Sequence, residues 1–348
     1  MSYDKISAAS VWWDNQQVSK RFLEDLKTEA VAYRHFVVPR VPWHDYFWDV
    51  FRDAMRDNGF SVYRFDCSEY TTAPSGTMLD CVVDKIGGLS AEYDGDLESI
   101  VDELGKAKYV WYFWNLNDDQ CDELFQLSQA LKQQALPVSL IIETVPVKLP
   151  EMKEIKLPYS SVDLYFFTWE LLMQKENPYL IEYKAMLINQ FAHGDPVRIA
   201  ECCKEADNCI YSPGKVCKWL TKEQIEQDQY RAQLRFLWPK LETARYEMCQ
   251  RFKDRLCGVE FPMKERYNNN PRSINTYASA DEFEFRHWVN YNDSGNIHYL
   301  DRDEKEWLKV LHKARNDLAH IQRIDTEDND EMDRFRKIID YCEKLHLE

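Results

Sequence analysis

The sequence predicts an α/β plus all-α protein, with a parallel-sheet α/β domain at residues 1–207 and a helical bundle at residues 208–348. In the first 205 or so residues, short apolar runs alternate with segments of helical pattern. After Pro178 the patterns are helical. Regular strand–helix alternation is typical of a parallel sheet covered by helices, so the change of pattern predicts a change of domain.

The first domain consists of predicted strands and helices in alternation. Strands are expected at residues 35–39, 61–66, 109–114, 138–142 and 162–167, and helices at 42–57, 95–105 and 117–135. Pro42 suits the first turn of its helix, where a missing amide hydrogen costs nothing. Asn117 or Asp118 is expected to cap the helix at 117–135. The aromatic run at 109–114 predicts a central strand buried on both faces.

The second part of the chain is expected to be helical. Helices are predicted at residues 179–193, 196–206, 223–256, 281–291, 302–322 and 330–346. The segment Cys209–Val216 contains Ser-Pro-Gly, which is typical of a linker, and Tyr267–Ser273 has the composition of a loop.

Length and composition set limits on the class of protein. A chain of 348 residues, 45% of them hydrophobic, is long enough for two domains with separate cores. No stretch reaches the ~18 apolar residues that would span a bilayer. The N-terminus lacks the basic and apolar regions of a secretory signal. We therefore expect a cytoplasmic protein with no membrane association.

The net charge of −16 argues against general nucleic-acid binding, which depends on neutralising phosphates. A local basic surface remains compatible with that charge, because residues 231–272 carry ten Lys and Arg against five Asp and Glu. The acidic stretch at residues 325–333 is interpreted as a solvated loop.

The ten cysteines are too few for a disulfide framework of the small secreted kind. Four of them, Cys202, Cys203, Cys209 and Cys217, form a cluster in the sequence. A zinc site normally shows paired knuckles such as CxxC, and this spacing does not. We therefore expect reduced, buried thiols and no metal, and the sequence indicates no other cofactor.

In the order of its elements, the first domain resembles the AAA or STAND class of P-loop ATPases. Those proteins place GxxxxGK[ST] directly after the first strand, and its backbone amides hold phosphate. The corresponding stretch here, Pro39–Asp45 (PRVPWHD), has no Gly and no Lys. Glu143 is a loose match to a catalytic or sensor position. The resemblance implies a degenerate P-loop-like domain that does not hydrolyse nucleotide; the alternative is an α/β domain with no nucleotide history.

The run Ala314–His320 (ARNDLAH) lies near the end of the predicted helix at 302–322. A helical wheel places the apolar residues on one face: Trp307, Val310, Leu311, Ala314, Leu318 and Ile321. The opposite side carries polar residues around one small Ala: His312, Arg315, Asn316, Ala319 and His320. This separation argues against a core role for His320 and leaves a solvated face, a structural cluster or a functional site.

Arg315-Asn316-Asp317-Leu318-Ala319-His320 resembles the motif of HEPN ribonucleases, in which four to six residues separate an Arg from a His and a polar residue usually follows the Arg. The resemblance implies RNA cleavage without a metal. His320 would transfer a proton to or from the ribose or the leaving oxygen, since histidine titrates near neutral pH. Arg315 would bind the scissile phosphate. Asn316 would orient the phosphate or His320.

HEPN ribonucleases pair two such motifs across a dimer, so the resemblance also implies a homodimer through the motif helix. His312 is a candidate second imidazole on the same face. Nearby basic residues, Arg266, Arg272 and Arg286, are candidate phosphate contacts, and Tyr267 could stack on a base. The alternative is a non-catalytic assembly or regulatory protein that binds RNA or a protein partner, the latter through the N-terminal domain.

Overall fold

The computed structural model describes residues 7–70, 77–89, 91–144, 152–174, 180–266 and 274–347. The chain divides into two compact units, Met1–Phe167 and Thr168–Glu348. The boundary between them falls within α7 (Ser161–Met173). The boundary expected from the sequence, between residues 207 and 208, falls within α10 (Ala206–Tyr211) of the second unit.

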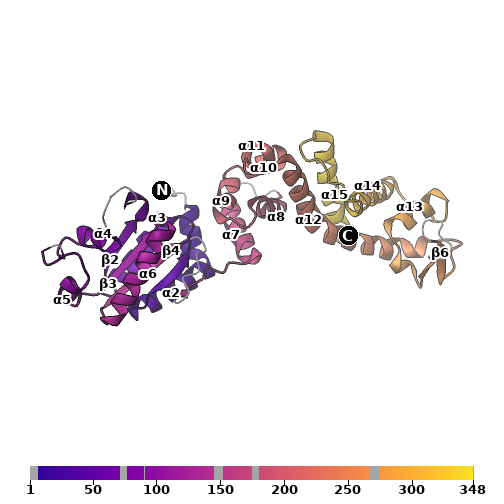
Figure 1. The fold of residues 1–348 in the computed structure, drawn as a ribbon. Coiled ribbons are helices and arrows are strands. Elements are labelled where there is room, and N and C mark those ends of the chain that lie inside the picture. The colour runs from indigo at the N-terminus through magenta and orange to yellow at the C-terminus, as the bar shows by residue number, and fades with distance from the viewer. Residues whose placement is uncertain are drawn as a thin grey trace, which may run out of the picture. The chain divides into compact units, whose positions relative to one another are not determined.

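The first unit contains a five-stranded sheet in the order β2-β3-β4-β1-β5 (Figure 1). Its strands are β1 (Phe36–Pro39), β2 (Ser61–Asp66), β3 (Tyr109–Trp114), β4 (Val138–Thr144) and β5 (Lys153–Glu154). Every neighbouring pair is parallel. The prediction of a parallel α/β domain followed by a helical region is confirmed.

Helices cover both faces of this sheet. On β3, Trp111 and Phe113 join the core made with α4 (Met78–Lys85) and α6 (Asp118–Gln133). Tyr112, which points to the opposite face because side chains alternate along a strand, packs on Phe47 of α3 (His44–Arg56). Trp13 and α2 (Gln17–Val31) complete that second core. The run at 109–114 is therefore buried on both faces, as its composition predicts.

Three expectations for the first unit need correction. The segment 162–167 is not a strand but part of α7, and Ser160 and Asp163 form the reciprocal hydrogen bonds that start a helix. The helix predicted at 42–57 begins only at His44, so Pro42 precedes it. The helix predicted at 95–105 is limited to the 3₁₀ turn η3 (Glu98–Ile100) and α5 (Val101–Leu104).

The remaining short elements of the first unit were not predicted: α1 (Ala8–Ser10), the π-helical η1 (Val11–Asn15) and η2 (Cys67–Tyr70). They carry buried side chains, among them Trp12, Trp13 and Cys67.

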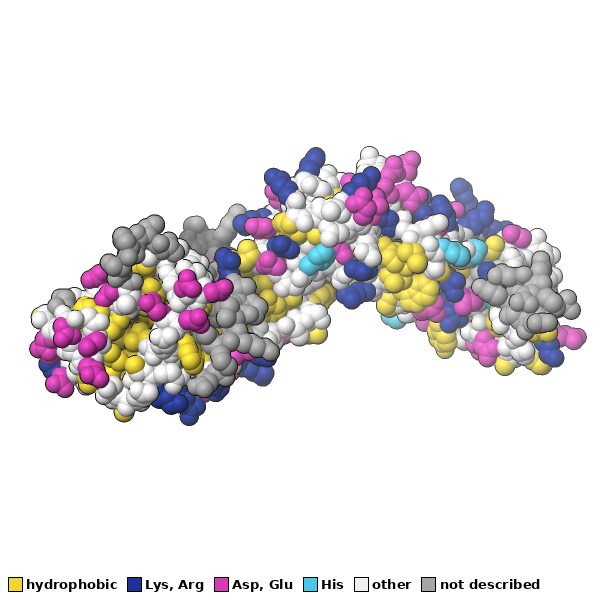
Figure 2. All heavy atoms as spheres, viewed as in Figure 1, with side chains coloured by type: hydrophobic (Ala, Val, Ile, Leu, Met, Phe, Trp, Pro, Cys, Tyr) yellow, Lys and Arg dark blue, Asp and Glu magenta, His cyan; other side chains and the backbone are white. Residues whose placement is uncertain are grey.

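The second unit is organised around α12 (Lys222–Phe252), a helix of 31 residues. It spans about 46 Å at 1.5 Å per residue. Three helices pack along it: α8 (Ile181–Ala192), α14 (Arg302–Ala319) and α15 (Asn329–Leu347). Thr221 and Gln224 form the capping box that fixes its first turn. On the visible surface of this unit, acidic and basic side chains are interspersed (Figure 2).

The other elements of the second unit lie before and after α12. They are α9 (Pro196–Lys204), α11 (Pro213–Val216), η4 (Lys253–Arg255), the antiparallel strands β6 (Met263–Arg266) and β7 (Ile274–Tyr277), η6 (Ala280–Glu282) and α13 (Phe285–Asp293). The linker predicted at Cys209–Val216 is wrong, because the segment forms the end of α10 and α11 and buries Cys209 and Ile210. Among the described residues, no helix is both long and apolar enough to cross a bilayer.

Candidate functional site

The helix that carries Arg315 is held at its N-terminal end by α12 and η4. Asp301 caps α14 and forms a reciprocal capping box with Glu304. The Glu304 carboxylate is only 2% exposed and accepts hydrogen bonds from Arg251 at 3.0 Å and Arg255 at 2.8 Å. A buried carboxylate is costly unless it is paired, so this contact fixes the start of α14.

The C-terminal end of α14 is also held by α12. The Tyr230 hydroxyl donates to the Leu318 carbonyl at 2.9 Å, and Gln233 makes two hydrogen bonds with the backbone of Ile324. The helix ends at Ala319, and His320 is its C-cap. Ile321 follows in the left-handed region with φ 59°. The motif therefore occupies the last turn of the helix, whereas the sequence predicted a helix that continues to residue 322.

The two faces of α14 largely follow the helical wheel. The buried side chains are Trp307, Leu308, Leu311, Ala314 and Leu318. His312, Arg315 and Asn316 are half-buried, and Ala319 and His320 are exposed. Ile321 is a correction: it lies beyond the helix and is 75% exposed, so it is not part of the packing face.

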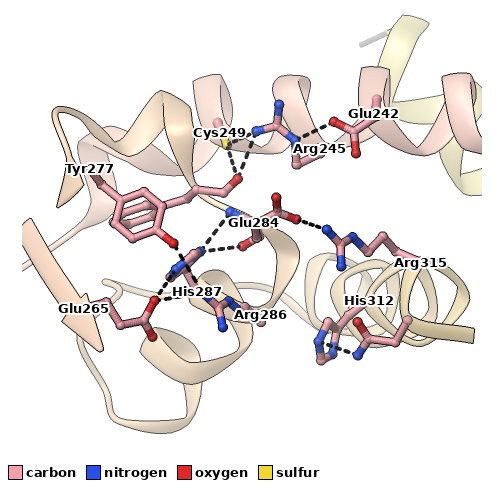
Figure 3. A network of polar contacts seen from close by, with 12 residues as sticks. Glu242, Arg245, Cys249, Glu265, Tyr277, Glu284, Arg286, His287, His312 and Arg315 are labelled. Atoms are coloured by element: carbon pink, nitrogen blue, oxygen red, sulfur yellow. Dashed lines mark hydrogen bonds and ion pairs between the residues drawn. The ribbon is translucent and has the colours of Figure 1, made fainter. Parts of the chain in front are cut away.

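The polar side of α14 faces a cavity of about 280 Å³. The cavity is lined by Asn275, Tyr277, Glu284, Phe285, Arg286, His312, Arg315, Asn316 and His320. The lining thus includes all three candidate catalytic residues together with His312 and Arg286. Figure 3 shows Arg315 and His312 on α14 and Arg286 on α13.

The guanidinium of Arg315 is already paired in this cavity. Its Nη2 lies 2.9 Å from a carboxylate oxygen of Glu284 (Figure 3). The guanidinium also lies over the ring of Trp238 on α12, 5.6 Å from the ring centroid. The Arg315 side chain is 29% exposed and that of Glu284 is 37% exposed. The ion pair and the contact with Trp238 therefore fix the orientation of the Arg315 guanidinium.

His312 and Asn316, one helical turn apart, are hydrogen-bonded to each other. The Asn316 Nδ2 lies 3.0 Å from the His312 Nε2, so the ring nitrogen accepts and the proton of the neutral imidazole is on Nδ1. Burial, and then the charge of Arg315, lowers the pKa of His312 below the usual histidine range. Both causes favour the neutral form of the imidazole. The described contact of Asn316 is with this ring, whereas the sequence suggested His320.

His320 occupies the open end of the cavity. Its backbone amide donates to the carbonyls of Asn316 and Asp317 at 3.0 and 3.2 Å, which closes the last turn. Its side chain is exposed and lines the cavity.

Arg286 enters the cavity from α13. Its Nη2 pairs with Glu265 at 3.0 Å and with the Tyr277 hydroxyl at 3.2 Å. The same carboxylate of Glu265 lies 2.9 Å from His287, which is 2% exposed. Polar side chains therefore form the contact between the strands β6 and β7 and the helix α13 (Figure 3).

For three other predicted substrate contacts the structure gives no side-chain position. Arg266 ends β6 and its backbone pairs with Ile274, while Tyr267 and Arg272 lie outside the described residues. The sequence reasoning missed Glu284, Asn275 and Tyr277. Glu284 stands 31 positions before Arg315, and no periodicity links two residues at that distance.

A second, apolar hollow of about 530 Å³ adjoins the motif helix. It is lined by Tyr230, Leu234, Arg235, Trp238, Pro239, Leu318 and Ala319. Trp238 thus contacts Arg315 and also lines the apolar hollow, so the polar cavity and the apolar surface share one boundary.

In the first unit, the end of β1 is where a P-loop ATPase would bind phosphate. Here Trp43 has φ 49° and the Pro42 carbonyl accepts a hydrogen bond from the indole of Trp13 at 2.9 Å. His44 stacks on Trp114, and its Nε2 lies 3.0 Å from Glu143. This connection packs on aromatic side chains and presents no glycine-rich turn.

Glu143 is 6% exposed and accepts a hydrogen bond from the Tyr112 hydroxyl at 2.5 Å. Burial, followed by the charge of this carboxylate, raises the pKa of Tyr112 well above its usual value. The carboxylate is therefore enclosed between Tyr112 and His44 near the carboxyl end of the central strand β4.

Comparison with known proteins gives little further information. No protein family matches the chain, and no curated protein is similar to it. Among solved structures, the Thermotoga maritima RuvB Holliday junction branch migration motor matches 81% of this chain and 95% of that chain, with 12% sequence identity and a TM-score of 0.33. The first unit is thus described by its own topology, as an α/β fold with a parallel sheet in which β1 lies between β4 and β5.

Proposed function

We propose that the second unit is a HEPN-type, metal-independent endoribonuclease, of the kind found in toxins or defence effectors, whose site is the cavity on α14. The first unit would be the sensor or interaction domain that controls it. The observation that carries the proposal is the cavity of about 280 Å³, in which His312, Arg315, Asn316 and His320 lie together with Arg286.

The cavity has the groups that this reaction needs. A base removes the proton from a ribose 2′-hydroxyl, the oxygen attacks the adjacent phosphorus, and the 5′-oxygen leaves with a proton from an acid. His320 at the rim would be one of these groups. His312, held neutral, would assist as a second imidazole. Arg315 would exchange Glu284 for the phosphate and stabilise its added charge.

One α14 supplies one His320, and the reaction would be more efficient if a second motif histidine, rather than His312 alone, served as the other proton-transfer group. A homodimer that pairs two copies of α14 would bring two motifs to one site. The apolar hollow beside Ala319 supports this arrangement, because it offers a surface that a second copy could cover. RNA and a second copy of the chain are therefore the partners we propose for this unit.

The proposal is tested by incubating the purified chain with labelled RNA in the presence of EDTA. We expect products with 2′,3′-cyclic phosphate ends from the wild type. His320→Ala and Arg315→Ala should each lower the rate roughly 100-fold or more. The matched controls are His346→Ala and Arg302→Ala, which change exposed residues outside the cavity lining and should cleave like the wild type.

An RNA with a 2′-deoxyribose at the cleaved position is the substrate control. It should bind normally and resist cleavage, because the attacking hydroxyl is absent. Equal cleavage by all four variants and the wild type would refute the assignment of the site.

A second candidate is a non-catalytic binding or assembly role. It is favoured by the ion pairs of the two cavity arginines, Arg315 with Glu284 and Arg286 with Glu265, which already have carboxylate partners. The same experiment separates the two. RNA or protein binding that depends on Arg315, with no cleavage by the wild type, would support this role.

A further inference from the structure

Three cysteines from three successive short helices meet in the interior of the second unit. Cys202 lies in α9, Cys209 lies in α10, and Cys217 follows directly after α11. Their Sγ atoms all lie within 4.8 Å of one another, and those of Cys202 and Cys217 are 3.8 Å apart. All three side chains are fully buried.

These distances fit a metal site made of thiolates. Zn²⁺ binds thiolate sulfur at about 2.3 Å in tetrahedral geometry, which places two sulfur ligands about 3.8 Å apart. The Cys202–Cys217 separation has this value, and Cys209 is near enough to complete the triangle with a small side-chain movement.

The burial of all three sulfur atoms also favours a bound cation. The thiolate is the form that binds metals, and a buried anion is costly unless a cation or hydrogen bonds compensate for it.

We propose that Cys202, Cys209 and Cys217 bind one Zn²⁺ ion that ties α9, α10 and α11 together, with the fourth tetrahedral position taken by a ligand that these cysteines do not supply. The expectation of no metal rested on the absence of CxxC pairs. The fold brings the three cysteines together from α9, from α10 and from the residue after α11, with six and seven residues between them in the sequence.

The ion would stabilise the segment that leads into α12. The Trp219 indole donates to the Phe191 carbonyl at 2.9 Å, and the Thr326 hydroxyl donates to the Ile210 carbonyl at 3.0 Å. These bonds join the cysteine segment to α8 and to the loop before α15. A bound ion would therefore be a further link between the short helices that precede α12, independently of the activity proposed for α14.

The test is the metal content of the full-length protein, purified under reducing conditions without chelator, by elemental mass spectrometry. We expect about one zinc per chain in the wild type and at least tenfold less in Cys209→Ala. Cys342→Ala, which removes another buried thiol of the same unit, is the matched control and should retain the zinc. A strong chelator should lower the melting temperature of the wild type and of Cys342→Ala.

A second measurement covers the case in which Cys209→Ala fails to fold. Cobalt added to the metal-free wild type should produce the near-ultraviolet absorption of sulfur-to-cobalt charge transfer, and zinc should abolish it. Wild-type protein that contains no zinc and shows no such band overturns the proposal. So does a disulfide between Cys202 and Cys217 in freshly purified protein, or zinc retained by folded Cys209→Ala.

Discussion

At the scale of single residues, Glu284 controls the electrostatic state of the cavity. Its carboxylate neutralises Arg315, while its place at the start of α13 makes it the N-cap of that helix. The two roles make different demands on the side chain, because an N-cap needs an oxygen that accepts a hydrogen bond and an ion pair needs a charged group. Glutamine at this position keeps the oxygen and removes the charge.

We therefore expect Glu284→Gln to bind a short RNA more tightly than the wild type, by roughly three- to tenfold, because charge-assisted hydrogen bonds contribute about 1.5–3 kcal/mol and the competing one is weakened. Glu260→Gln, at an exposed position, should leave the affinity unchanged. Fluorescence anisotropy at fixed salt measures both. Weaker binding by Glu284→Gln would show that the carboxylate contributes to the site.

The lowered pKa of His312 predicts that the stability of the folded chain depends on pH. Its pKa is lowered in the folded chain, so the unfolded chain binds more protons in the range just below the ordinary histidine pKa. This contribution is present above that pKa and is lost as the pH falls through it. The melting temperature of the wild type should therefore fall more between about pH 7.5 and 5.5 than that of His312→Gln. Equal changes in the melting temperature of the wild type and of His312→Gln over this pH range would contradict this prediction.

At the scale of elements, α14 depends on how α12 and η4 hold it. Glu304 is buried and receives Arg251 and Arg255, whereas Glu306 on the same helix is exposed. Removing one partner of a buried ion pair leaves uncompensated charge. The exposed neighbour has no such contact to lose.

Glu304→Ala should lower the free energy of unfolding of the second unit by about 2–4 kcal/mol, a value discounted because both arginines are partly exposed. Glu306→Ala should change it by less than about 0.5 kcal/mol. Urea unfolding, followed by circular dichroism, compares the two. Equal midpoints would mean that the ion pairs do not hold α14.

The same elements show what the sequence could predict. The aromatic run at 109–114 is long, apolar and rich in strand formers, and it forms β3. The run at 162–167 has similar composition, yet it is helical, because Ser160 and Asp163 start a helix just before it. The periodicity of a short apolar run does not distinguish a strand from a buried helix, so the capping residues decide which of the two forms.

For the site, the wheel of α14 placed His312, Arg315 and Asn316 on one side, since that is a property of a single helix. The ion pair with Glu284 and the convergence of Cys202, Cys209 and Cys217 depend on how helices pack. Such contacts between elements have no signature in one sequence.

At the scale of the whole molecule, the net charge of −16 opposes the approach of RNA. Binding must then come from a local surface. Two copies of α14 side by side would double the number of cavity arginines, Arg286 and Arg315, over a small area, which one copy cannot do. Self-association is therefore central to the proposed activity.

A substitution at Ala319 tests whether self-association is required for RNA cleavage. Ala319 is exposed, lies between the polar cavity and the apolar hollow, and has no side chain to lose from the core. Ala319→Arg should leave the melting temperature unchanged, because exposed substitutions cost little. It should abolish dimer formation in analytical ultracentrifugation and RNA cleavage together, since a long charged side chain cannot be accommodated in a close contact between helices. Ala91→Arg, the same change at an exposed position of the first unit, should do neither. If Ala319→Arg remains dimeric, the contact between copies lies elsewhere. If Ala319→Arg is monomeric and still cleaves RNA, a single copy of the cavity is sufficient for the reaction.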